Sequence, residues 1–531
     1  MNNIPVALVA FKELENLGVG YLASVLKEAG YEPEIIDFVQ GKEQILKQLL
    51  KLKPVITGFS VVFQYHIYEF RELIGYLREG GIRNHFTAGG YYASLRFEEL
   101  FRFIPWLDSV VRFDGEYTLL ELVDCINTGK DWRKVSGIVS RNNGEITSNP
   151  LRPLETDLDK FPFPKRAPLT GYAYEKKFAT LLAGRGCVNN CSFCNNREYN
   201  KQSLGPLKRI RNPEKVVEEM EFLHHKMDCS VFMFQDDDFP VKTEKGSAWT
   251  ESFCDELRRK KLNDKIMWKI NCRPDEIDYN SFARMKRHGL FLVFLGIDDG
   301  TDSGLAMLNK HMSVEKSLEG INILKKLEIS FDYGFMLFQP TSTYSMVYEN
   351  LRFLKQICGD GYAPVTFLKL RPYFETRVEE ELKKEGRLKG LPGFLDYDFL
   401  DESLNHYYEF ITDCFMEWLT DPDGLINLLK WSINYISVIS FYYKITPEIS
   451  EISRDIRKSI SESNLFLLDT MKELAVYFES GKYNNGNYSE LKADRERIKS
   501  VHDHYTKQMN KLIHKLFLFV AYQKLNQLIS C

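Results

Sequence analysis

Residues 184–196 read G-R-G-C-V-N-N-C-S-F-C-N-N and place three cysteines within eight residues. Cys187, Cys191 and Cys194 supply three thiolates, and the stretch has no fourth. A cubane 4Fe-4S cluster has four irons, so a loop that binds three of them leaves one iron open for a substrate or cofactor. The spacing therefore predicts a catalytic iron-sulfur cluster with these three cysteines as its metal ligands.

Two other interpretations of the cysteines are weaker. Structural zinc normally closes with four ligands in paired knuckles, and no second pair follows within a short distance. Three unrelated core cysteines would not be expected to cluster among Gly184, Gly186 and several asparagines. Ferredoxin spacings differ too, because they supply a fourth cysteine.

The C-x3-C-x2-C spacing resembles the signature of the radical S-adenosylmethionine (radical SAM) superfamily. In that superfamily the open iron binds the amino and carboxylate groups of the methionine moiety of SAM. The resemblance implies a catalytic role for Cys187, Cys191 and Cys194, and it places Phe193, inside the motif, beside the bound cofactors.

Length and composition set the scale of the fold. A chain of 531 residues is too long for one ordinary core and is expected to form roughly three domains. With 44% apolar and 27% charged residues the composition is that of a globular protein. The net charge of −4 provides no overall basic field, which argues against a dedicated nucleic-acid binder.

Cysteine usage and apolar runs bear on the compartment. Ten cysteines in so long a chain, seven of them scattered singly, do not form a disulfide framework. The opening M-N-N-I-P-V-A-L-V-A lacks the basic region and long apolar stretch of a signal peptide. No uninterrupted apolar run is long enough for a transmembrane segment. We therefore expect a cytoplasmic protein.

The order of elements predicts an α/β fold with three parts. Over residues 1–140 short apolar strands alternate with helices, which indicates a parallel, doubly wound, Rossmann-like sheet. A linker rich in Pro, Asn and Asp is expected over 141–175. Residues 176–392 contain six apolar strand patterns, which predict a partial, TIM-like (β/α)6 barrel with its chemistry at the C-terminal rim. Residues 393–531 are predicted to form a mainly α-helical domain.

Three N-terminal segments extend the resemblance. They are E-N-L-G-V-G-Y-L-A-S-V-L-K-E-A-G (15–30), T-A-G-G-Y-Y-A-S (87–94) and F-D-G-E (113–116). Joined to the cysteine motif, they are similar to the cobalamin-dependent radical SAM family, whose N-terminal domain holds cobalamin over the barrel mouth. The resemblance places seven residues near the corrin and its nucleotide tail: Gly58, Ser60, Gly89, Gly90, Tyr91, Gly115 and Glu116. Taken by themselves, the glycines are explained equally well as ordinary tight turns.

No D-x-H-x-x-G motif is present, so a cobalamin held by a histidine is not expected. We expect His66 to be a helix-surface residue and His85 a strand-edge residue, and neither to bind a metal.

The barrel segment adds further candidates for cofactor binding. Asp236 and Asp237, followed by Asp238, match the family's acidic pair near the SAM amino group or the substrate, and such crowded charges need compensation. Arg273 suits a carboxylate or ribose contact, with a structural salt bridge as the alternative. Asp298 stands where many relatives place a glutamate that binds the ribose hydroxyls.

The segment R-P-Y-F-E-T-R (371–377) departs from the family's usual P-Y-P-G-T. Tyr373 and Glu375 are candidates to face the substrate, and a packed aromatic and a helix N-terminal acid explain them equally well.

The resemblance implies reductive cleavage of SAM to a 5'-deoxyadenosyl radical and C-methylation of an unactivated carbon from methylcobalamin. A natural product or a peptide is the expected substrate, and a low-potential donor such as flavodoxin or ferredoxin the expected partner. Rearrangement, cyclisation or ring contraction without methyl transfer is one alternative. A non-catalytic cobalamin-binding sensor is another, and the three cysteines argue against it.

Overall fold

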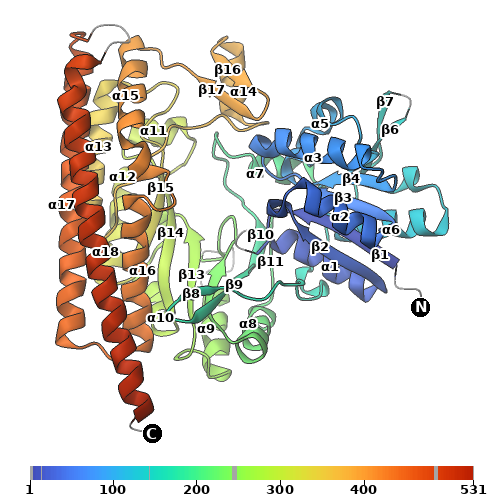
Figure 1. Ribbon diagram of the computed structural model, residues 1–531, viewed down its shortest axis with the longest axis horizontal. Coiled ribbons are helices and arrows are strands. Elements are labelled where there is room, and N and C mark those ends of the chain that lie inside the picture. The colour runs from blue at the N-terminus through green and yellow to red at the C-terminus, as the bar shows by residue number, and fades with distance from the viewer. Residues whose placement is uncertain (1–3, 13–14, 143, 242–247, 484–487, 530–531) are drawn as a thin grey trace.

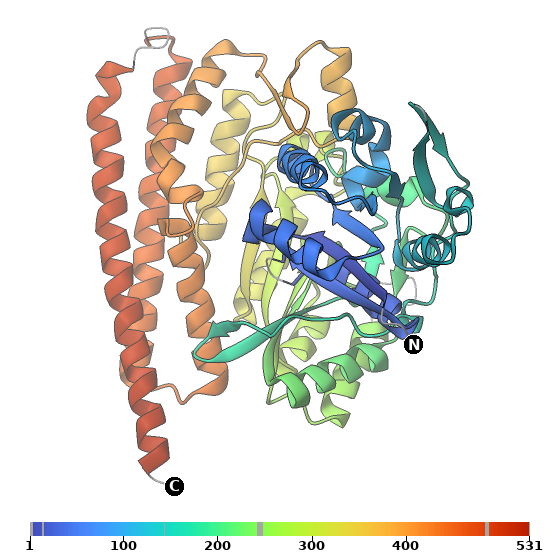
Figure 2. The ribbon, with the colours of Figure 1, turned by 45° about the vertical axis from the view of Figure 1, so that its right-hand side comes forward.

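The structure is a computed structural model that describes residues 4–12, 15–142, 144–241, 248–483 and 488–529. An N-terminal sheet domain lies at one end, a curled central sheet in the middle and long C-terminal helices at the other end (Figures 1 and 2). Within the described residues, no helix combines the length and the apolarity needed to cross a membrane.

The N-terminal domain is built on a seven-stranded sheet in the order β2-β1-β3-β4-β5-β6-β7. The first five strands in this order are parallel, and β6 and β7 are antiparallel additions at one edge. The strands are β1 (Ile4–Ala10), β2 (Tyr31–Asp37), β3 (Ile56–Ser60), β4 (His85–Gly89), β5 (Ser109–Val111), β6 (Ile138–Asn142) and β7 (Glu145–Ser148).

Helices cover both faces of this sheet, which explains why its central strands are almost wholly apolar. One core contains side chains of α1 and α6, and a second core on the opposite face contains those of α2 and α3. The doubly wound fold is thereby confirmed. Its helices are α1 (Leu17–Glu28), α2 (Lys42–Leu52), α3 (Ile67–Glu79), α4 (Tyr91–Leu95), α5 (Phe97–Phe103) and α6 (Glu116–Thr128).

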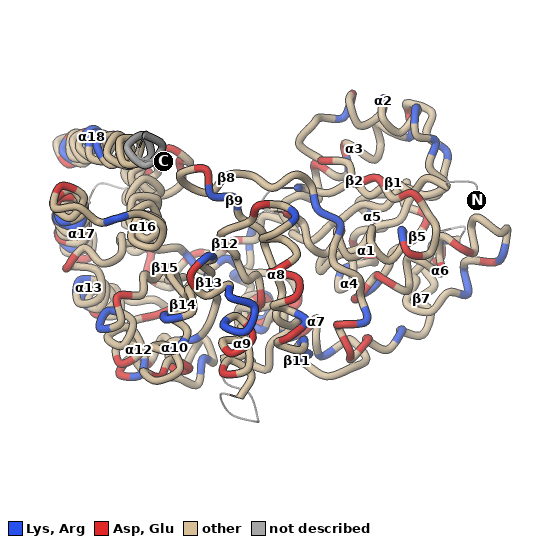
Figure 3. Tube along the Cα trace, turned by 90° about the horizontal axis from the view of Figure 1, so that it is seen from below, with Lys and Arg blue, Asp and Glu red and all other residues tan. Residues whose placement is uncertain are grey.

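The central sheet has the order β15-β14-β13-β12-β9-β8, with five parallel strands and an antiparallel β8 at one edge. It curls into the predicted partial barrel (Figure 3). The strands are β8 (Gly171–Ala173), β9 (Lys176–Leu181), β12 (Cys229–Phe234), β13 (Met267–Cys272), β14 (Leu290–Asp298) and β15 (Ser330–Phe335).

The sixth parallel strand, expected over V-T-F-L-K-L-R-P-Y, forms only an isolated parallel bridge between Phe338 and Lys369. Leu368 N–H donates to the Phe335 carbonyl at 2.8 Å, and Leu370 N–H to that of Phe338 at 2.8 Å. Proline at 364 and at 372 cannot donate to a ladder, which limits the pairing to this short stretch.

Helices pack on the convex side of the central sheet, and two short elements flank the cysteine loop. The loop follows β10 and precedes α7, and β10 pairs with β11 in a small antiparallel ribbon. These elements are β10 (Gly184–Gly186), α7 (Asn196–Gln202), β11 (Lys208–Ile210), α8 (Pro213–Met227), α9 (Ala248–Arg259), α10 (Tyr279–Arg287), α11 (Asp302–Met307), α12 (Val314–Lys326) and α13 (Tyr344–Cys358).

The C-terminal part is helical after a short hairpin. Helix α16 lies beside β15, on the opposite side of the sheet from α10 and α12 (Figure 3). The elements are α14 (Arg377–Lys384), β16 (Leu388–Leu391), β17 (Phe394–Tyr397), α15 (Glu402–Leu419), α16 (Leu425–Tyr442), α17 (Pro447–Glu479) and α18 (Lys492–Ile529).

The domain limits at 140, 175 and 392 stay predictions. Strands β6 and β7 extend the N-terminal sheet to Ser148, into the segment expected to be a linker.

Candidate active site

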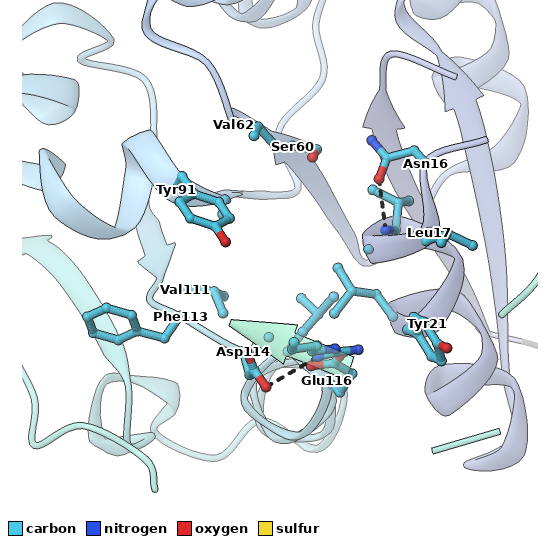
Figure 4. A pocket seen from close by; sticks show the side chains of 18 of the residues that line it. Asn16, Leu17, Tyr21, Ser60, Val62, Tyr91, Val111, Phe113, Asp114 and Glu116 are labelled. Atoms are coloured by element: carbon cyan, nitrogen blue, oxygen red, sulfur yellow. Dashed lines mark hydrogen bonds and ion pairs between the residues drawn. The ribbon is translucent and has the colours of Figure 1, made fainter. Parts of the chain in front are cut away.

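A cavity of about 500 Å³ lies between the carboxyl edge of the N-terminal sheet and the β10-β11 ribbon. Side chains from several N-terminal loops surround it, among them Asn16, Ser60, Tyr91 and Glu116 (Figure 4). All seven residues that the resemblance places near cobalamin line this cavity: Gly58, Ser60, Gly89, Gly90, Tyr91, Gly115 and Glu116. The carboxyl ends of parallel strands meet at one edge, which is where doubly wound sheets bind ligands.

Gly90 shows why glycine occupies this edge. Its φ is +112°, and a Cβ there would lie 2.8 Å from the Val61 carbonyl oxygen. Close backbone packing therefore requires a glycine at this position even without a ligand. This agrees with the alternative interpretation of the glycines as tight-turn residues.

The segment around the cysteine loop contributes the charged wall of the cavity. Arg185 donates to Glu116 Oε1 at 2.7 Å and to Asp114 Oδ2 at 3.2 Å, and Arg209 donates to the same Asp114 oxygen at 2.7 Å. The Arg185 guanidinium also lies 5.0 Å from the ring centroid of Tyr21. This network joins the F-D-G-E segment to the G-R-G segment. The sequence offered Arg185 only as a neighbour of the cysteine motif.

The cavity suits a large ligand with both polar and apolar parts. Glu116 Oε2 and Asn200 Nδ2 are buried without a hydrogen-bond partner among the described residues, and both residues line the cavity. Such atoms are costly unless a ligand or water satisfies them. Apolar side chains such as Leu22 and Val111 form the rest of the wall. The lining therefore fits cobalamin.

The cysteine loop is held at its start and in its middle by contacts with backbone atoms. Gly186 has φ +84°, and a Cβ there would overlap the Leu207 carbonyl oxygen. Ser192 N–H donates to the Leu308 carbonyl at 3.0 Å, and its Oγ donates to the Met307 carbonyl at 3.0 Å. The end of α11 thus anchors the middle of the loop.

The three thiols lie in one electrostatic environment. Burial raises the pKa of Cys187 and Cys191, and that of Cys194 to about 12, with the other two cysteines adding to the effect on Cys194. Within the described part of the chain, no three His, Cys, Asp or Glu side chains already converge as a metal site. Because raised pKa values disfavour free thiolates, deprotonation here depends on bound metal. Three neighbouring thiols on one loop fit a cluster with one open iron.

The three aspartates after β12 diverge. Asp236 Oδ2 accepts from Ala183 N–H at 3.0 Å, Asp237 Oδ1 from Asn196 Nδ2 at 2.7 Å, and Asp238 pairs with Lys208 at 2.7 Å. Burial raises the pKa of Asp236 to about 7 and that of Asp237 to about 6. The negative charges of the three aspartates are thus compensated by one cation, Lys208, and by two hydrogen-bond donors, as expected. Asp237 also lines the cavity.

Two basic residues lie near Cys191. Lys310 and Arg273 both lower the pKa of its thiol against the larger effect of burial. Arg273 binds Asp275 at 2.9 Å and the Lys310 carbonyl at 2.6 Å, so the salt-bridge interpretation describes part of its contacts. Asp298, with φ +67°, pairs with Lys310 Nζ at 2.6 Å. Sequence reasoning missed Lys310.

Phe193, half-buried, packs against the core of the barrel, and the structure records no polar contact that would define its role.

The R-P-Y-F-E-T segment contacts the N-terminal domain. Gln64 donates to the Pro372 carbonyl at 3.3 Å and accepts from Phe374 N–H at 3.0 Å. The Phe374 ring lies edge-on to Tyr92 at 5.0 Å, and Glu375 pairs with Arg96 at 3.0 Å. The unusual Phe and Glu thus form domain contacts.

The two histidines have neighbours that account for them. His66 stacks on Phe11 at 4.2 Å and contacts Glu69. His85 hydrogen-bonds Ser109 Oγ at 2.7 Å, and burial lowers its pKa to about 4.

Comparison with known proteins identifies both halves of the site. The B12 binding domain matches residues 4–123, and the radical SAM superfamily matches residues 181–354. An uncharacterized methyltransferase of Pyrococcus horikoshii is 27% identical over 68% of this chain and 77% of that protein. An anaerobic magnesium-protoporphyrin IX monomethyl ester cyclase of Rubrivivax gelatinosus is 28% identical, but the match spans only 63% of this chain and 60% of the cyclase.

Two solved structures share the fold over most of this chain. The cobalamin-dependent SAM radical enzyme OxsB, with aqua-cobalamin and SAM bound, superposes with a TM-score of 0.69 at 16% identity, covering 97% of this chain and 80% of OxsB. The radical SAM methyltransferase TsrM from Kitasatospora setae gives 0.62 at 16% identity, covering 74% and 80%.

The fold and the two matched domains define a radical SAM enzyme with a B12-binding domain. The chain belongs to the cobalamin-dependent radical SAM enzymes, and its cofactors are cobalamin, SAM and a 4Fe-4S cluster.

Proposed function

We propose that this chain is a C-methyltransferase acting on an unactivated carbon of a natural-product or peptide substrate. The observation that carries the proposal is a shared space: Gly186 and Asp237 of the radical SAM domain line the same cavity as Gly90 and Tyr91. A radical generator and a methyl donor must both reach one carbon, so their sites have to adjoin. The relatives named methyltransferases support methyl transfer.

When bound, the cluster and SAM supply a 5'-deoxyadenosyl radical, and cobalamin supplies the methyl group. We assign Cys187, Cys191 and Cys194 as the cluster ligands. Lys310 and Arg273 put positive charge beside Cys191, which suits the carboxylate of the methionine moiety.

At the N-terminal side, we assign the seven cavity residues of the resemblance to cobalamin. Tyr91 stacks on Tyr199 with ring centroids 4.1 Å apart, and burial raises the pKa of Tyr91 well above its usual value. This neutral aromatic pair lines the cavity near Cys194 and Asp237, and it would keep water from the reacting groups.

The alternative activity is rearrangement, cyclisation or ring contraction without methyl transfer, which the relatives named cyclases favour. Either activity needs a low-potential electron donor, for which we propose flavodoxin or ferredoxin.

The test is product analysis with anaerobically reconstituted enzyme, reductant and candidate substrates. Methyl transfer predicts 5'-deoxyadenosine, S-adenosylhomocysteine and methylated product together. Deoxyadenosine without homocysteine, alongside an altered substrate, would establish the alternative. Replacing Cys187, Cys191 or Cys194 by Ser should abolish deoxyadenosine formation, whereas Cys125→Ser, in the N-terminal domain, should not.

A further inference from the structure

The strand register defines layers of side chains on the concave side of the central sheet. Side chains alternate between the two faces of a strand, so residues two apart point the same way. The lowest layer is apolar and packs on α16 through Val438 and its neighbours. That layer contains Phe178, Val231, Met267 and Phe291. Helix α16 therefore closes the base of the half-barrel.

Lys269 occupies the next layer. It is paired with Met233 on β12 and with Leu292 on β14, which places it in the middle of the sheet. Its Nζ bonds to Asn271 Oδ1 and lies 5.6 Å from the Phe294 ring centroid. Burial lowers the pKa of Lys269 to about 8. No sequence motif singled out this residue.

The other cations near this space already have carboxylate partners. Lys430 of α16 pairs with Asp332 at 2.9 Å, and Lys310 pairs with Asp298 at 2.6 Å. Among the described residues, no carboxylate forms a direct ion pair with Lys269, although Asp332 and Asp236 are close enough to raise its pKa against the larger effect of burial. A half-buried amine whose partner is an amide is costly, and an incoming anion would lower that cost.

Two paired glycines lie above the Lys269 layer. Gly296 and Gly334 are register partners on adjacent strands, so neither strand contributes a side chain of its own at that level of the concave face. A Cβ at Gly296 would lie 3.3 Å from Lys310 Nζ, and one at Gly334 would lie 3.6 Å from Asp298 Oδ1. The Asp298–Lys310 pair therefore lies directly over these glycines, and an anion bound to Lys269 would lie below that pair. Both residues of the pair are close enough to Cys191 to affect the pKa of its thiol.

We propose that the inside of the half-barrel binds an oxyanion of the substrate, a carboxylate or a phosphate, with Lys269 as its counter-ion. The identity of the whole substrate rests on the proposed function, whereas the anion site does not. Lys269 is a substrate-binding residue here. The competing explanation is that Lys269 only orders Asn271, whose Nδ2 donates to the Asp236 carbonyl at 2.9 Å.

Competitive acylation of the reconstituted enzyme tests the site without knowledge of the substrate. Trace acetic anhydride is added at pH 8, and labelled lysines are quantified by peptide mass spectrometry. The probes are inorganic phosphate, propionate and neutral propionamide at one ionic strength. We expect phosphate or propionate, and not propionamide, to slow labelling of Lys269 at least threefold, and Lys430 to be unaffected. Whichever anion protects identifies the oxyanion.

Asn271→Asp provides the matched variant, because it places a carboxylate beside Lys269 while leaving the amine in place to be measured. Its Lys269 labelling should no longer respond to either anion. Equal protection by propionamide, equal protection of Lys430, or an unchanged anion response in N271D would each overturn the proposal.

Steady-state kinetics of Lys269 variants test the anion site independently of the proposed methyltransferase activity. With any substrate that is turned over, Lys269→Gln should raise KM tenfold or more with little loss of kcat, and Lys269→Arg should recover much of that loss. An unchanged KM in K269Q would contradict the site. Anion protection with no methyl transfer from any candidate would leave the anion site standing and reject the methyltransferase.

Discussion

Arg185 joins the cavity at the edge of the N-terminal sheet to the cysteine loop, and replacing it by Met tests whether the two domains depend on this buried contact. Its guanidinium binds Glu116 Oε1 at 2.7 Å and Asp114 Oδ2 at 3.2 Å. Asp114 would keep Arg209 at 2.7 Å, whereas Glu116, only 4% exposed, has no second ion-pair partner among the described residues. R185M therefore leaves one buried carboxylate without a counter-charge.

The expected cost follows from that isolated charge. Removing one partner of a buried ion pair costs about 3–5 kcal/mol. Since about 1.4 kcal/mol corresponds to a factor of ten, local opening should become more frequent by a factor of roughly 10² to 4 × 10³. Amide hydrogen exchange of the apo chain, followed by mass spectrometry, reports such opening in β10, β11 and α6. The double variant R185M/E116Q replaces the unpaired Glu116 carboxylate by a neutral amide, and it should recover part of the protection from amide exchange.

Arg377 offers a matched control on the surface. It pairs with Glu381 at 2.7 Å, and the two side chains are 68% and 48% exposed. Exposed pairs contribute about 1 kcal/mol or less, so Arg377→Met should accelerate local exchange by no more than about fivefold. Two results would show that the Arg185 contact does not hold the domains together. One is an exchange rate in R185M that is raised no more than in R377M, and the other is an equally fast exchange in R185M and R185M/E116Q.

Three further outcomes are expected. Gly186→Ala should lose most of its reconstituted iron and sulfide, because a φ of +84° is strained for any residue with a Cβ. Gly171→Ala should keep both, because no atom lies within 4 Å of the position that a Cβ would take there. Phe374→Ala should lower the free energy of unfolding by about 3–5 kcal/mol in denaturant titrations, since the ring is buried against the N-terminal domain; a loss below 1 kcal/mol would contradict that packing. Lys269→Met should stabilise the apo chain by about 3 kcal/mol at neutral pH. The pKa of Lys269 is about 8 in the folded chain and 10.5 in the unfolded chain, so the charged amine destabilises the folded state, and Met removes that charge. This gain should shrink as pH rises from 8 to 10.5, and thermal melts that showed a constant gain would refute it.

The sequence was sufficient for the features that local patterns encode. Apolar strands between helices predicted a doubly wound sheet, and glycines at strand ends, such as Gly58 and Gly90, fell around one cavity because parallel strands share a carboxyl edge. The spacing of the three cysteines predicted the cofactor class that the matched domains support.

Contacts between distant segments could not be predicted from one sequence. Arg185 and Glu116 are 69 residues apart, and nothing in either segment specifies the other as its partner. Lys310 was missed for the same reason, since its pairing with Asp298 and its closeness to Cys191 appear only once α11 packs on the loop. The antiparallel β8 and the position of α16 inside the curl of the sheet also depend on long-range packing.

Directional charged contacts act together with apolar packing to fix how the two cofactor domains meet. Arg185 pairs with Glu116 of the F-D-G-E segment, and Arg96 pairs with Glu375 of the R-P-Y-F-E-T segment. Arg166 binds Glu15 at 3.0 Å and Glu219 at 2.8 Å. Arginine in such contacts accepts only a narrow range of geometries, whereas an apolar interface tolerates sliding. In the proposed reaction, a methyl donor and a radical precursor in separate domains must be held at one separation for transfer to occur. The arginine contacts therefore act on the chemistry without touching the reacting atoms, by fixing the distance between the cavity and the cysteine loop.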